Sequence, residues 1–158
     1  TKTGVDFFEN REYWESIAEN IVFTGKIDEF YQYQFGKLQY RTVRFEEEIH
    51  DTPNYQGNAV VNYTEKEVPF TRIIEHKHFE YGTQPQTIIT REYPISWSRK
   101  EEAYYPINDS HNNALYLKYR ALASQKNNFI FGGRLAEYTY YDMDKIVRAA
   151  LDKAKEVL

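Results

Sequence analysis

The sequence contains no cysteine among its 158 residues, which excludes disulfide bridges and thiolate metal sites. It has no excess of basic residues either. Its 20 Lys and Arg are outnumbered by 24 Asp and Glu, so it lacks the positive surface that nucleic-acid binding needs. No apolar run approaches the length of a membrane-spanning helix, and no signal peptide opens the chain. We therefore expect a cytoplasmic protein with neither a membrane span nor a nucleic-acid partner.

Aromatic residues are abundant instead, at 17% of the chain, with 15 Tyr, 10 Phe and 2 Trp. Tyrosine offers a flat stacking face and a polar tip, and both suit the binding of sugars and bases. Half-buried β-sheets also favour Tyr and Phe for purely structural reasons. For any single tyrosine the two interpretations remain open.

The first residues have the character of a β-α-β unit. A short strand is predicted over Lys2–Phe7, a helix over Glu9–Asn20, and a buried strand over Ile21–Gly25. Because this unit is too small to fold as a nucleotide domain alone, we assign residues 1–28 to part of a larger α/β domain.

The middle of the chain predicts an antiparallel sheet. Four segments alternate between apolar and polar residues and are rich in Val, Ile, Thr, Tyr and Phe: Gln39–Ile49, Gly57–Thr64, Thr71–Phe79 and Thr87–Tyr93. Short connections with Pro, Gly and Asn separate them, as in a series of hairpins. We assign residues 29–98 to a sheet domain.

The last third, residues 99–158, predicts a helix over Asn112–Ser124, a strand over Phe129–Phe131 and a helix over Asp142–Leu158. The final helix carries an apolar stripe that needs a larger surface than this chain supplies. The predicted fold class is α+β, an antiparallel sheet flanked by β-α elements of an α/β domain. Of a small self-contained fold and the C-terminal portion of a longer protein, we favour the second.

The segment from Gly132 to Asp144 predicts an anion site. Gly132 and Gly133 allow a ligand to approach the backbone closely, and Arg134 can fork onto phosphate oxygens. The final helix, which Asp142 can cap, presents free N–H groups at its positive end. We therefore expect a cofactor or nucleotide at this corner.

Several blocks of the sequence together resemble the UDP-galactopyranose mutase family. In chain order these blocks are Phe23–Asp28, Phe35–Arg41, Gln56–Tyr63, Pro69–Phe79, Tyr104–Asn108 and Gly132–Asp144. They extend over nearly the whole chain, and their combination is highly specific. The resemblance covers only the C-terminal part of the family's length, because the N-terminal Gly-rich fingerprint, the helical domain and the mobile substrate loop have no counterpart here.

The resemblance implies an isomerase that interconverts UDP-galactopyranose and UDP-galactofuranose for a cell-wall or surface polysaccharide. Reduced FAD performs the chemistry in this family through an adduct between flavin N5 and the sugar. This chain would hold the sheet domain together with elements that complete the FAD-binding domain. We expect it to be inactive by itself, and we leave open whether the full-length form is a homodimer.

The resemblance also implies roles for individual residues. Arg72 would contact the diphosphate and Asn62 the substrate, while Arg41 is a weaker candidate of the same kind. The phenols of Tyr105 and Tyr140 would reach the substrate phosphates. Arg134, Tyr141, Asp142 and Met143 would contact the cofactor. From the residues alone, a surface sheet cation is the favoured interpretation of Arg72, and core filling or an aromatic corner stays open for the two tyrosines.

Other chemistries find less support. His76 and His78 alternate onto one strand face with Arg72, but two histidines without a third ligand make a weak metal site, and we expect no metal. The Gly-x-Ser-x-Gly elbow of hydrolases is absent, and no side chain is assigned as catalytic. A non-catalytic, aromatic-rich module that binds glycans or nucleotide sugars is the main alternative, and a flavin oxidoreductase with the same cofactor corner is another.

Overall fold

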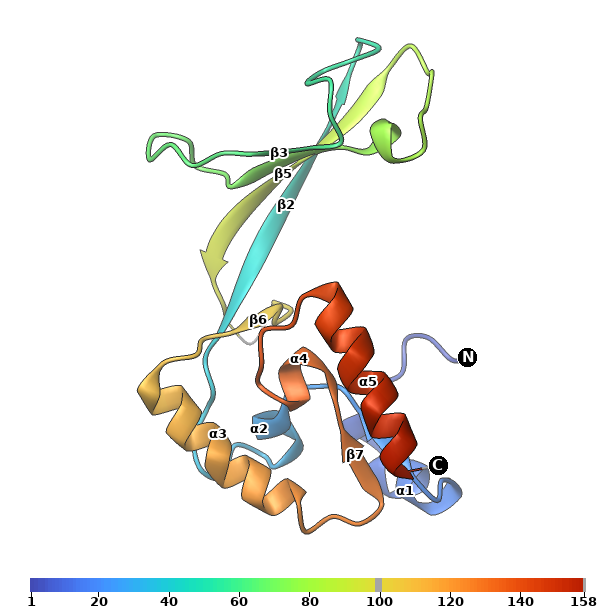
Figure 1. The fold of residues 1–158 in the computed structure, drawn as a ribbon, viewed down its shortest axis with the longest axis vertical. Coiled ribbons are helices and arrows are strands. Elements are labelled where there is room, and N and C mark those ends of the chain that lie inside the picture. The colour runs from blue at the N-terminus through green and yellow to red at the C-terminus, as the bar shows by residue number, and fades with distance from the viewer. Residues whose placement is uncertain (99–100, 158) are drawn as a thin grey trace. The chain divides into compact units, whose positions relative to one another are not determined.

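The chain leaves its first folded unit after Gln39 and returns to it at Tyr105. The computed structural model describes residues 1–98 and 101–157, with helices and strands mixed as the α+β prediction requires. One compact unit combines Thr1–Gln39 with Tyr105–Leu158, and the other is Tyr40–Tyr104 (Figure 1). Among the described residues, no helix has the length and apolar character needed to cross a membrane.

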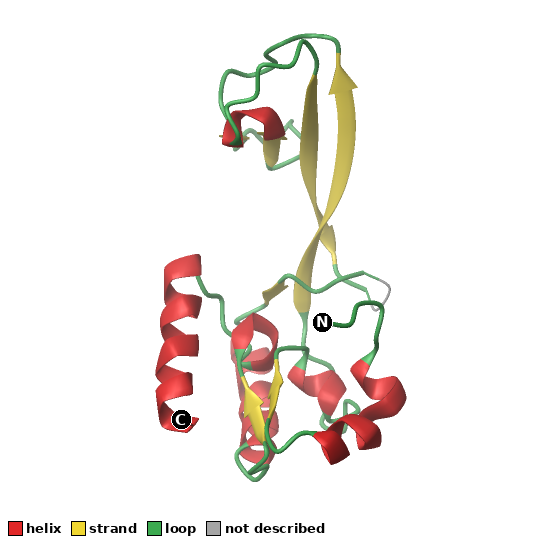
Figure 2. Cartoon of the chain, turned by 90° about the vertical axis from the view of Figure 1, so that its right-hand side faces the viewer, coloured by secondary structure: helices red, strands yellow, loops and turns green. Residues whose placement is uncertain are grey.

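The first unit is built on two short parallel strands that are far apart in the sequence. Strand β1 (Ile21–Phe23) pairs with β7 (Phe129–Phe131), as the two short parallel strands of Figure 2 show. Val22 lies opposite Ile130 in the register. Parallel strands are joined by crossover connections rather than by tight turns, and here the intervening chain includes the whole second unit. The strand predicted over Phe129–Phe131 is confirmed.

The predicted strand over Lys2–Phe7 is wrong. Gly4 has a φ of +65°, and the Asp6 carboxylate accepts a hydrogen bond from the Phe8 amide at 2.8 Å, which caps a 3₁₀ turn, η1 (Phe7–Asn10). Helix α1 (Arg11–Ile17) follows directly. The opening is therefore not a β-α-β unit, and β1 finds its partner at the other end of the chain.

An aromatic cluster fills the core of the first unit around Phe30, at the end of helix α2 (Ile27–Phe30). Its ring centroid lies 4.9 Å from those of Phe23, Phe129 and Phe131. Aromatic pairs in such tilted and edge-on arrangements contribute about 0.5–1.5 kcal/mol each beyond simple burial. This cluster explains part of the high aromatic content without any ligand.

The remaining elements of the first unit follow the return at Tyr105. They are β6 (Tyr105–Pro106), α3 (Ser110–Ala123), α4 (Gly133–Ala136) and α5 (Met143–Val157). Asp109 caps α3 by accepting a hydrogen bond from the Asn112 amide at 2.7 Å. The helices predicted over Asn112–Ser124 and Asp142–Leu158 are present as α3 and α5, and each begins within two residues of its predicted start.

The second unit is an antiparallel sheet with strands in the order β3-β4-β5-β2. The long strands β2 (Tyr40–His50) and β5 (Thr87–Ser96) pair along their length, while β3 (Val60–Asn62) and β4 (Arg72–Glu75) are short. Each of the four strands overlaps a segment in which alternation predicted a strand.

One predicted strand of this sheet ends early. The strand expected over Thr71–Phe79 stops at Glu75, and a 3₁₀ turn, η2 (His76–Phe79), replaces its second half. The physical reason is Lys77, which is buried and donates through Nζ to the carbonyls of Pro53 at 2.9 Å and Gln84 at 2.5 Å. Drawing this ammonium inward to two carbonyls turns the backbone away from the sheet.

Tyr138 joins the two points where the chain leaves and re-enters the first unit. Its hydroxyl lies 2.5 Å from the Gln39 carbonyl, to which it donates, and it accepts a hydrogen bond from the Ile107 amide at 3.2 Å. The side chain is 2% exposed, and its burial raises the pKa of the phenol to about 12. Asn112, fully buried, adds a bond from the Gln39 amide to its Oδ1 at 3.1 Å.

Removing this hydroxyl should destabilise the first unit. We expect Tyr138→Phe to lower the free energy of unfolding by about 1–3 kcal/mol at pH 7, because buried partners lose a hydrogen bond. Tyr13→Phe, at a half-exposed ring of the same unit, is the matched control. Because the raised pKa favours the neutral phenol, the contribution is complete below pH 10 and disappears as the pH rises towards 12. Urea unfolding of both variants at pH 7 and pH 10.5 measures it, and equal stabilities would contradict the role.

Candidate functional site

Asn62, Arg72 and Arg41 lie on one face of the second unit's sheet. The register places Asn62 opposite Arg72, Arg72 opposite Glu92, and Glu92 opposite Phe45. Side chains of directly paired residues share a face, and so do residues four apart on a strand, which adds Arg41 through Phe45. Asn62, Arg72 and Glu92 thus form a row across three strands.

Arg72 is held at the centre of this row. Its Nε donates to Asn62 Oδ1 at 2.9 Å, and its Nη1 lies 3.7 Å from Glu92 Oε2. The Arg72 side chain remains 42% exposed, whereas Glu92 is 16% exposed. An arginine fixed by an amide and a carboxylate, yet open to solvent, is oriented in advance for an incoming anion.

Sequence reasoning missed Glu92. Alternation gave a partial indication of it. Glu92 lies in the alternating segment Thr87–Tyr93, an even number of residues from the exposed Ile88, Pro94 and Ser96. Without the register, however, nothing indicated which residue of this segment faces Arg72. Arg41 is exposed and lies four residues, or about 13 Å of strand, from Phe45, so it does not belong to the row.

In the first unit, Tyr105 and Tyr140 lie side by side. Their ring centroids are 5.2 Å apart with a 35° tilt between the planes. The Arg134 guanidinium carbon lies 5.4 Å from the centroid of Tyr105 and 5.6 Å from that of Tyr140. The structure therefore brings two predicted substrate residues and one predicted cofactor residue into a single cluster.

The Arg134 fork is directed at the protein's own backbone. Its Nε and Nη2 donate to the Tyr141 carbonyl oxygen at 2.9 and 2.5 Å. Two of its nitrogens are thus engaged by the backbone, and the expectation that Arg134 forks onto phosphate stays a prediction. Tyr141 enters the site through its carbonyl, and burial raises the pKa of its phenol.

Asp142 and Met143 stand at the start of α5. The Asp142 carboxylate pairs with Lys145 Nζ at 3.0 Å, and both side chains are more than half exposed. Met143 is 82% exposed. The first-turn N–H groups of α5 have no intrahelical acceptor and carry the positive end of the helix dipole.

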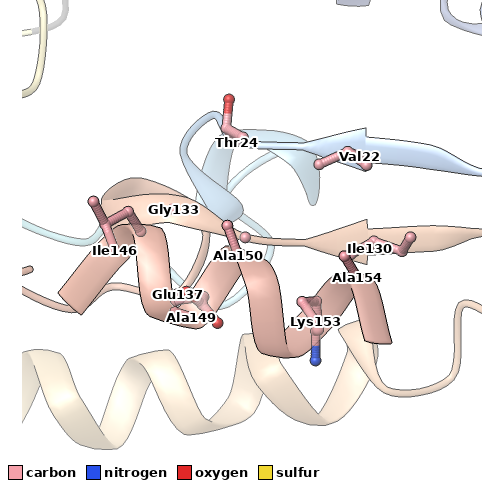
Figure 3. Close-up of a pocket in the computed structure, with 11 residues that line it drawn as sticks. Val22, Thr24, Ile130, Gly133, Glu137, Ile146, Ala149, Ala150, Lys153 and Ala154 are labelled. Carbon is pink, nitrogen blue, oxygen red and sulfur yellow. The ribbon is translucent and has the colours of Figure 1, made fainter. Parts of the chain in front are cut away.

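A cavity of about 310 Å³ lies beside this helix, between α5 and the strands β1 and β7. Val22 and Ile130 from the strands line it together with Ile146, Ala150 and Ala154 of the helix (Figure 3). The walls are apolar, so the cavity suits a hydrocarbon or aromatic group better than a phosphate.

Gly133 stands at one end of the cavity in a conformation that side chains disfavour. Its φ is +88°, and a Cβ there would lie 3.5 Å from Thr24 Cβ. Glycine is therefore required by the backbone turn rather than by a lack of space. The chain turns sharply here and passes directly into the Arg134 cluster.

His76 and His78 do not share a strand face with Arg72, contrary to the predicted alternation. They lie on η2, where His76 Nε2 is 2.7 Å from Thr90 Oγ1 and His78 Nε2 is 3.0 Å from Glu75 Oε2. Across residues 1–98 and 101–157, no three His, Asp or Glu side chains are grouped to hold a metal ion.

Comparison with known proteins identifies the family. The family model described as UDP-galactopyranose mutase matches residues 1–140, which include Asn62, Arg72, Tyr105 and Tyr140. The chain belongs to the UDP-galactopyranose mutase family. This confirms the resemblance found in the sequence, and the match ends just before Tyr141.

Individual members of the UDP-galactopyranose mutase family agree with this assignment. The chain is 40% identical over 140 residues to a probable UDP-galactopyranose mutase of Klebsiella pneumoniae, covering 88% of this chain and 36% of that protein. It is 37% identical over 137 residues to a dTDP-fucopyranose mutase of Escherichia coli, covering 86% and 36%. The UDP-galactopyranose mutase of Mycoplasma genitalium is 37% identical over 148 residues, covering 90% and 36%. The chain thus spans about a third of the length of these relatives.

Glu75, the last residue of β4, stabilises the part of the second unit next to η2. Its carboxylate is fully buried and accepts hydrogen bonds from the Tyr55 amide at 3.0 Å, the Gln56 amide at 2.9 Å and the Thr87 hydroxyl at 2.8 Å. Burial acts to raise the pKa of Glu75, but the bonds led by the Gln56 and Tyr55 amides outweigh it and lower the pKa from 4.5 to about 2.

The loss of this carboxylate should destabilise the second unit in a pH-dependent way. Because the pKa is lowered on folding, its contribution is complete above pH 4.5 and decreases as the pH falls towards 2. We expect Glu75→Gln to lower the free energy of unfolding by roughly 1.5–3 kcal/mol at pH 7, and by less at pH 3. Denaturant unfolding at both pH values checks this, with the exposed Glu47→Gln on β2 as control. A pH-independent difference would refute the assignment.

Proposed function

We propose that this chain is the C-terminal part of a flavin-dependent UDP-galactopyranose mutase, an isomerase that interconverts UDP-galactopyranose and UDP-galactofuranose in the cytoplasm. The observation that carries the proposal is a family match over residues 1–140 that includes an arginine oriented by its neighbours on an open sheet face. The galactofuranose product would serve a cell-wall or surface polysaccharide.

Arg72 would neutralise the substrate diphosphate. Its planar guanidinium suits bidentate contact with phosphate oxygens, and Asn62 and Glu92 already restrict its rotamers. The same contact would stabilise the charge that develops when the diphosphate leaves the sugar. Asn62 would contact the substrate from the neighbouring strand, and Arg41 would add positive charge further along the same face.

Tyr105 and Tyr140 would donate their hydroxyls to the substrate phosphates. A phenol can donate a hydrogen bond to a phosphate oxygen without bringing a charge of its own. Because the two ring centroids are 5.2 Å apart, both hydroxyls could reach the same diphosphate. Tyr140 is 54% exposed, so its ring is accessible to a ligand.

The turn around Arg134, together with the start of α5, would hold FAD. The first turn of α5, around Met143, has backbone N–H groups that could donate to a polar ligand. Gly132 has no side chain, so such a ligand could approach its backbone closely. Asp142 would contact the same ligand, while Arg134 and the Tyr141 carbonyl would support the loop. The chemistry that reduced FAD supplies when bound is nucleophilic attack at the anomeric carbon of the sugar. No side chain of this chain is assigned a proton transfer.

The division into two compact units supports assigning them separate roles. The unit of residues 40–104 would be the substrate sheet, and the unit of residues 1–39 and 105–158 would complete an FAD-binding domain. The domain limits predicted from the sequence, 1–28, 29–98 and 99–158, remain a proposal of the same kind.

A second candidate substrate deserves an equal test, because one relative is a dTDP-fucopyranose mutase at 37% identity. Both substrates are nucleoside diphosphate sugars, so the diphosphate role of Arg72 would serve either. Assaying the complete flavoprotein with UDP-galactopyranose and dTDP-fucopyranose in parallel decides between them. The non-catalytic glycan-binding alternative predicts binding of sugars that lack a nucleotide.

The mutase assignment predicts ring isomerisation without net oxidation. We expect the complete protein, with its flavin reduced by dithionite, to convert UDP-galactofuranose to UDP-galactopyranose, and residues 1–158 alone to show no turnover. Chromatographic separation of the two nucleotide sugars provides the measurement. Steady consumption of a redox partner in place of isomerisation would instead indicate an oxidoreductase.

The diphosphate assignment predicts the effect of Arg72→Ala. We expect it to weaken UDP binding to the complete flavoprotein by about 10- to 150-fold, the equivalent of one charge-assisted hydrogen bond. Arg44→Ala, on the opposite face of the same sheet by strand alternation, is the matched control. Titration calorimetry measures both. An affinity for UDP that survives the loss of Arg72 would remove the proposed contact.

A further inference from the structure

The guanidinium of Arg134 is fixed by the backbone of a residue further along the chain. Two of its nitrogens, Nε and Nη2, converge on the Tyr141 carbonyl oxygen at 2.9 and 2.5 Å. Because these nitrogens belong to one rigid planar group, the shared acceptor restricts the orientation of the whole guanidinium.

The fixed guanidinium lies beside two aromatic rings. Its carbon is 5.4 Å from the Tyr105 centroid and 5.6 Å from the Tyr140 centroid, so neither ring is favoured over the other. Both distances fall within the range in which a cation is attracted by the ring quadrupole. The two rings are themselves 5.2 Å apart.

The contacts come from three separate parts of the first unit. Tyr105 begins β6, Arg134 lies in α4, and Tyr140 lies in the loop that precedes α5. Arg134 fixes Tyr140 in two ways: it lies beside the Tyr140 ring, and it donates hydrogen bonds to the carbonyl of the adjacent Tyr141. The single guanidinium of Arg134 thus contacts the rings of both tyrosines.

We propose that Arg134 is a positioning residue that holds the phenols of Tyr105 and Tyr140 side by side and thereby sets nucleotide affinity without touching the nucleotide. The inference rests on the proposed function, in which these phenols bind the diphosphate. It links the cofactor loop to the substrate residues, because the same guanidinium also fixes the Tyr141 carbonyl next to α5.

Arg134→Lys is the decisive variant, because lysine keeps the positive charge and loses the planar fork. In the complete flavoprotein we expect the UDP affinity, measured per flavin-loaded molecule, to fall about three- to tenfold. Arg148→Lys, at an exposed arginine of α5, should leave the UDP affinity unchanged. Should Arg134→Lys fail to fold, Arg134→Gln keeps an N–H donor for the Tyr141 carbonyl and serves the same comparison.

A double-mutant cycle separates positioning from direct contact. The background variant carries Tyr105→Phe and Tyr140→Phe, which remove the hydroxyls and keep the rings. If Arg134 acts through the phenols, Arg134→Lys should cost less than about twofold in UDP affinity in that background. A loss in the background equal to that in the wild type would show that Arg134 meets the nucleotide itself, and would overturn the proposal.

A second measurement needs no nucleotide. 3-Fluorotyrosine placed at position 105 or 140 of the flavin-loaded protein reports the ring environment by ¹⁹F NMR. We expect Arg134→Lys to shift both resonances and Arg148→Lys to shift neither. Unshifted resonances would overturn the positioning role. If the wild type does not bind UDP, the diphosphate role fails, while the fluorine spectra still decide whether Arg134 positions the rings.

Discussion

The hydroxyl of Tyr138 is the contact on which the arrangement of the first unit depends. It binds the Gln39 carbonyl, the last residue before the chain departs, and the Ile107 amide, just after the chain returns. Tyr105 lies two residues before Ile107, and Tyr140 lies two residues after Tyr138. One buried phenol therefore aligns the two segments that carry the candidate phosphate-binding tyrosines, and Arg134 then fixes their rings.

The row Asn62–Arg72–Glu92 shows a second kind of preorganisation. Glu92 and Asn62 reduce the rotational freedom of Arg72, which lowers the entropy lost when a ligand binds. Glu92 also offsets the charge of Arg72, so a singly charged anion gains little there. A diphosphate brings more negative charge and several acceptor oxygens, and it can therefore compete for the guanidinium where a weaker anion cannot. Under the proposed function, the row would select ligands by charge as well as by geometry.

The sequence predicted local features well and long-range ones poorly. The sequence located Phe129–Phe131, and alternation located the four strands of the sheet. The pairing of β1 with β7 was not predictable, because it joins segments separated by the whole second unit. η2 was missed because its cause, the burial of Lys77 against two distant carbonyls, leaves no periodic signal. The contact of Arg134 with the Tyr141 carbonyl likewise could not be inferred from spacing.

Helix α5 carries one wide apolar stripe, and part of that stripe is left uncovered by the first unit. Ile146, Ala150 and Ala154 line the cavity beside β1 and β7, whereas Val147 and Leu151 remain 58% and 56% exposed. Val22 on β1 is 65% exposed as well. Burying side chains of this size contributes about 1.5–3 kcal/mol each, and a two-stranded sheet is too small to cover them. The apolar stripe of an amphipathic helix packs against a domain core, so its exposed part supports the proposal that further chain completes the first unit as a larger cofactor-binding domain.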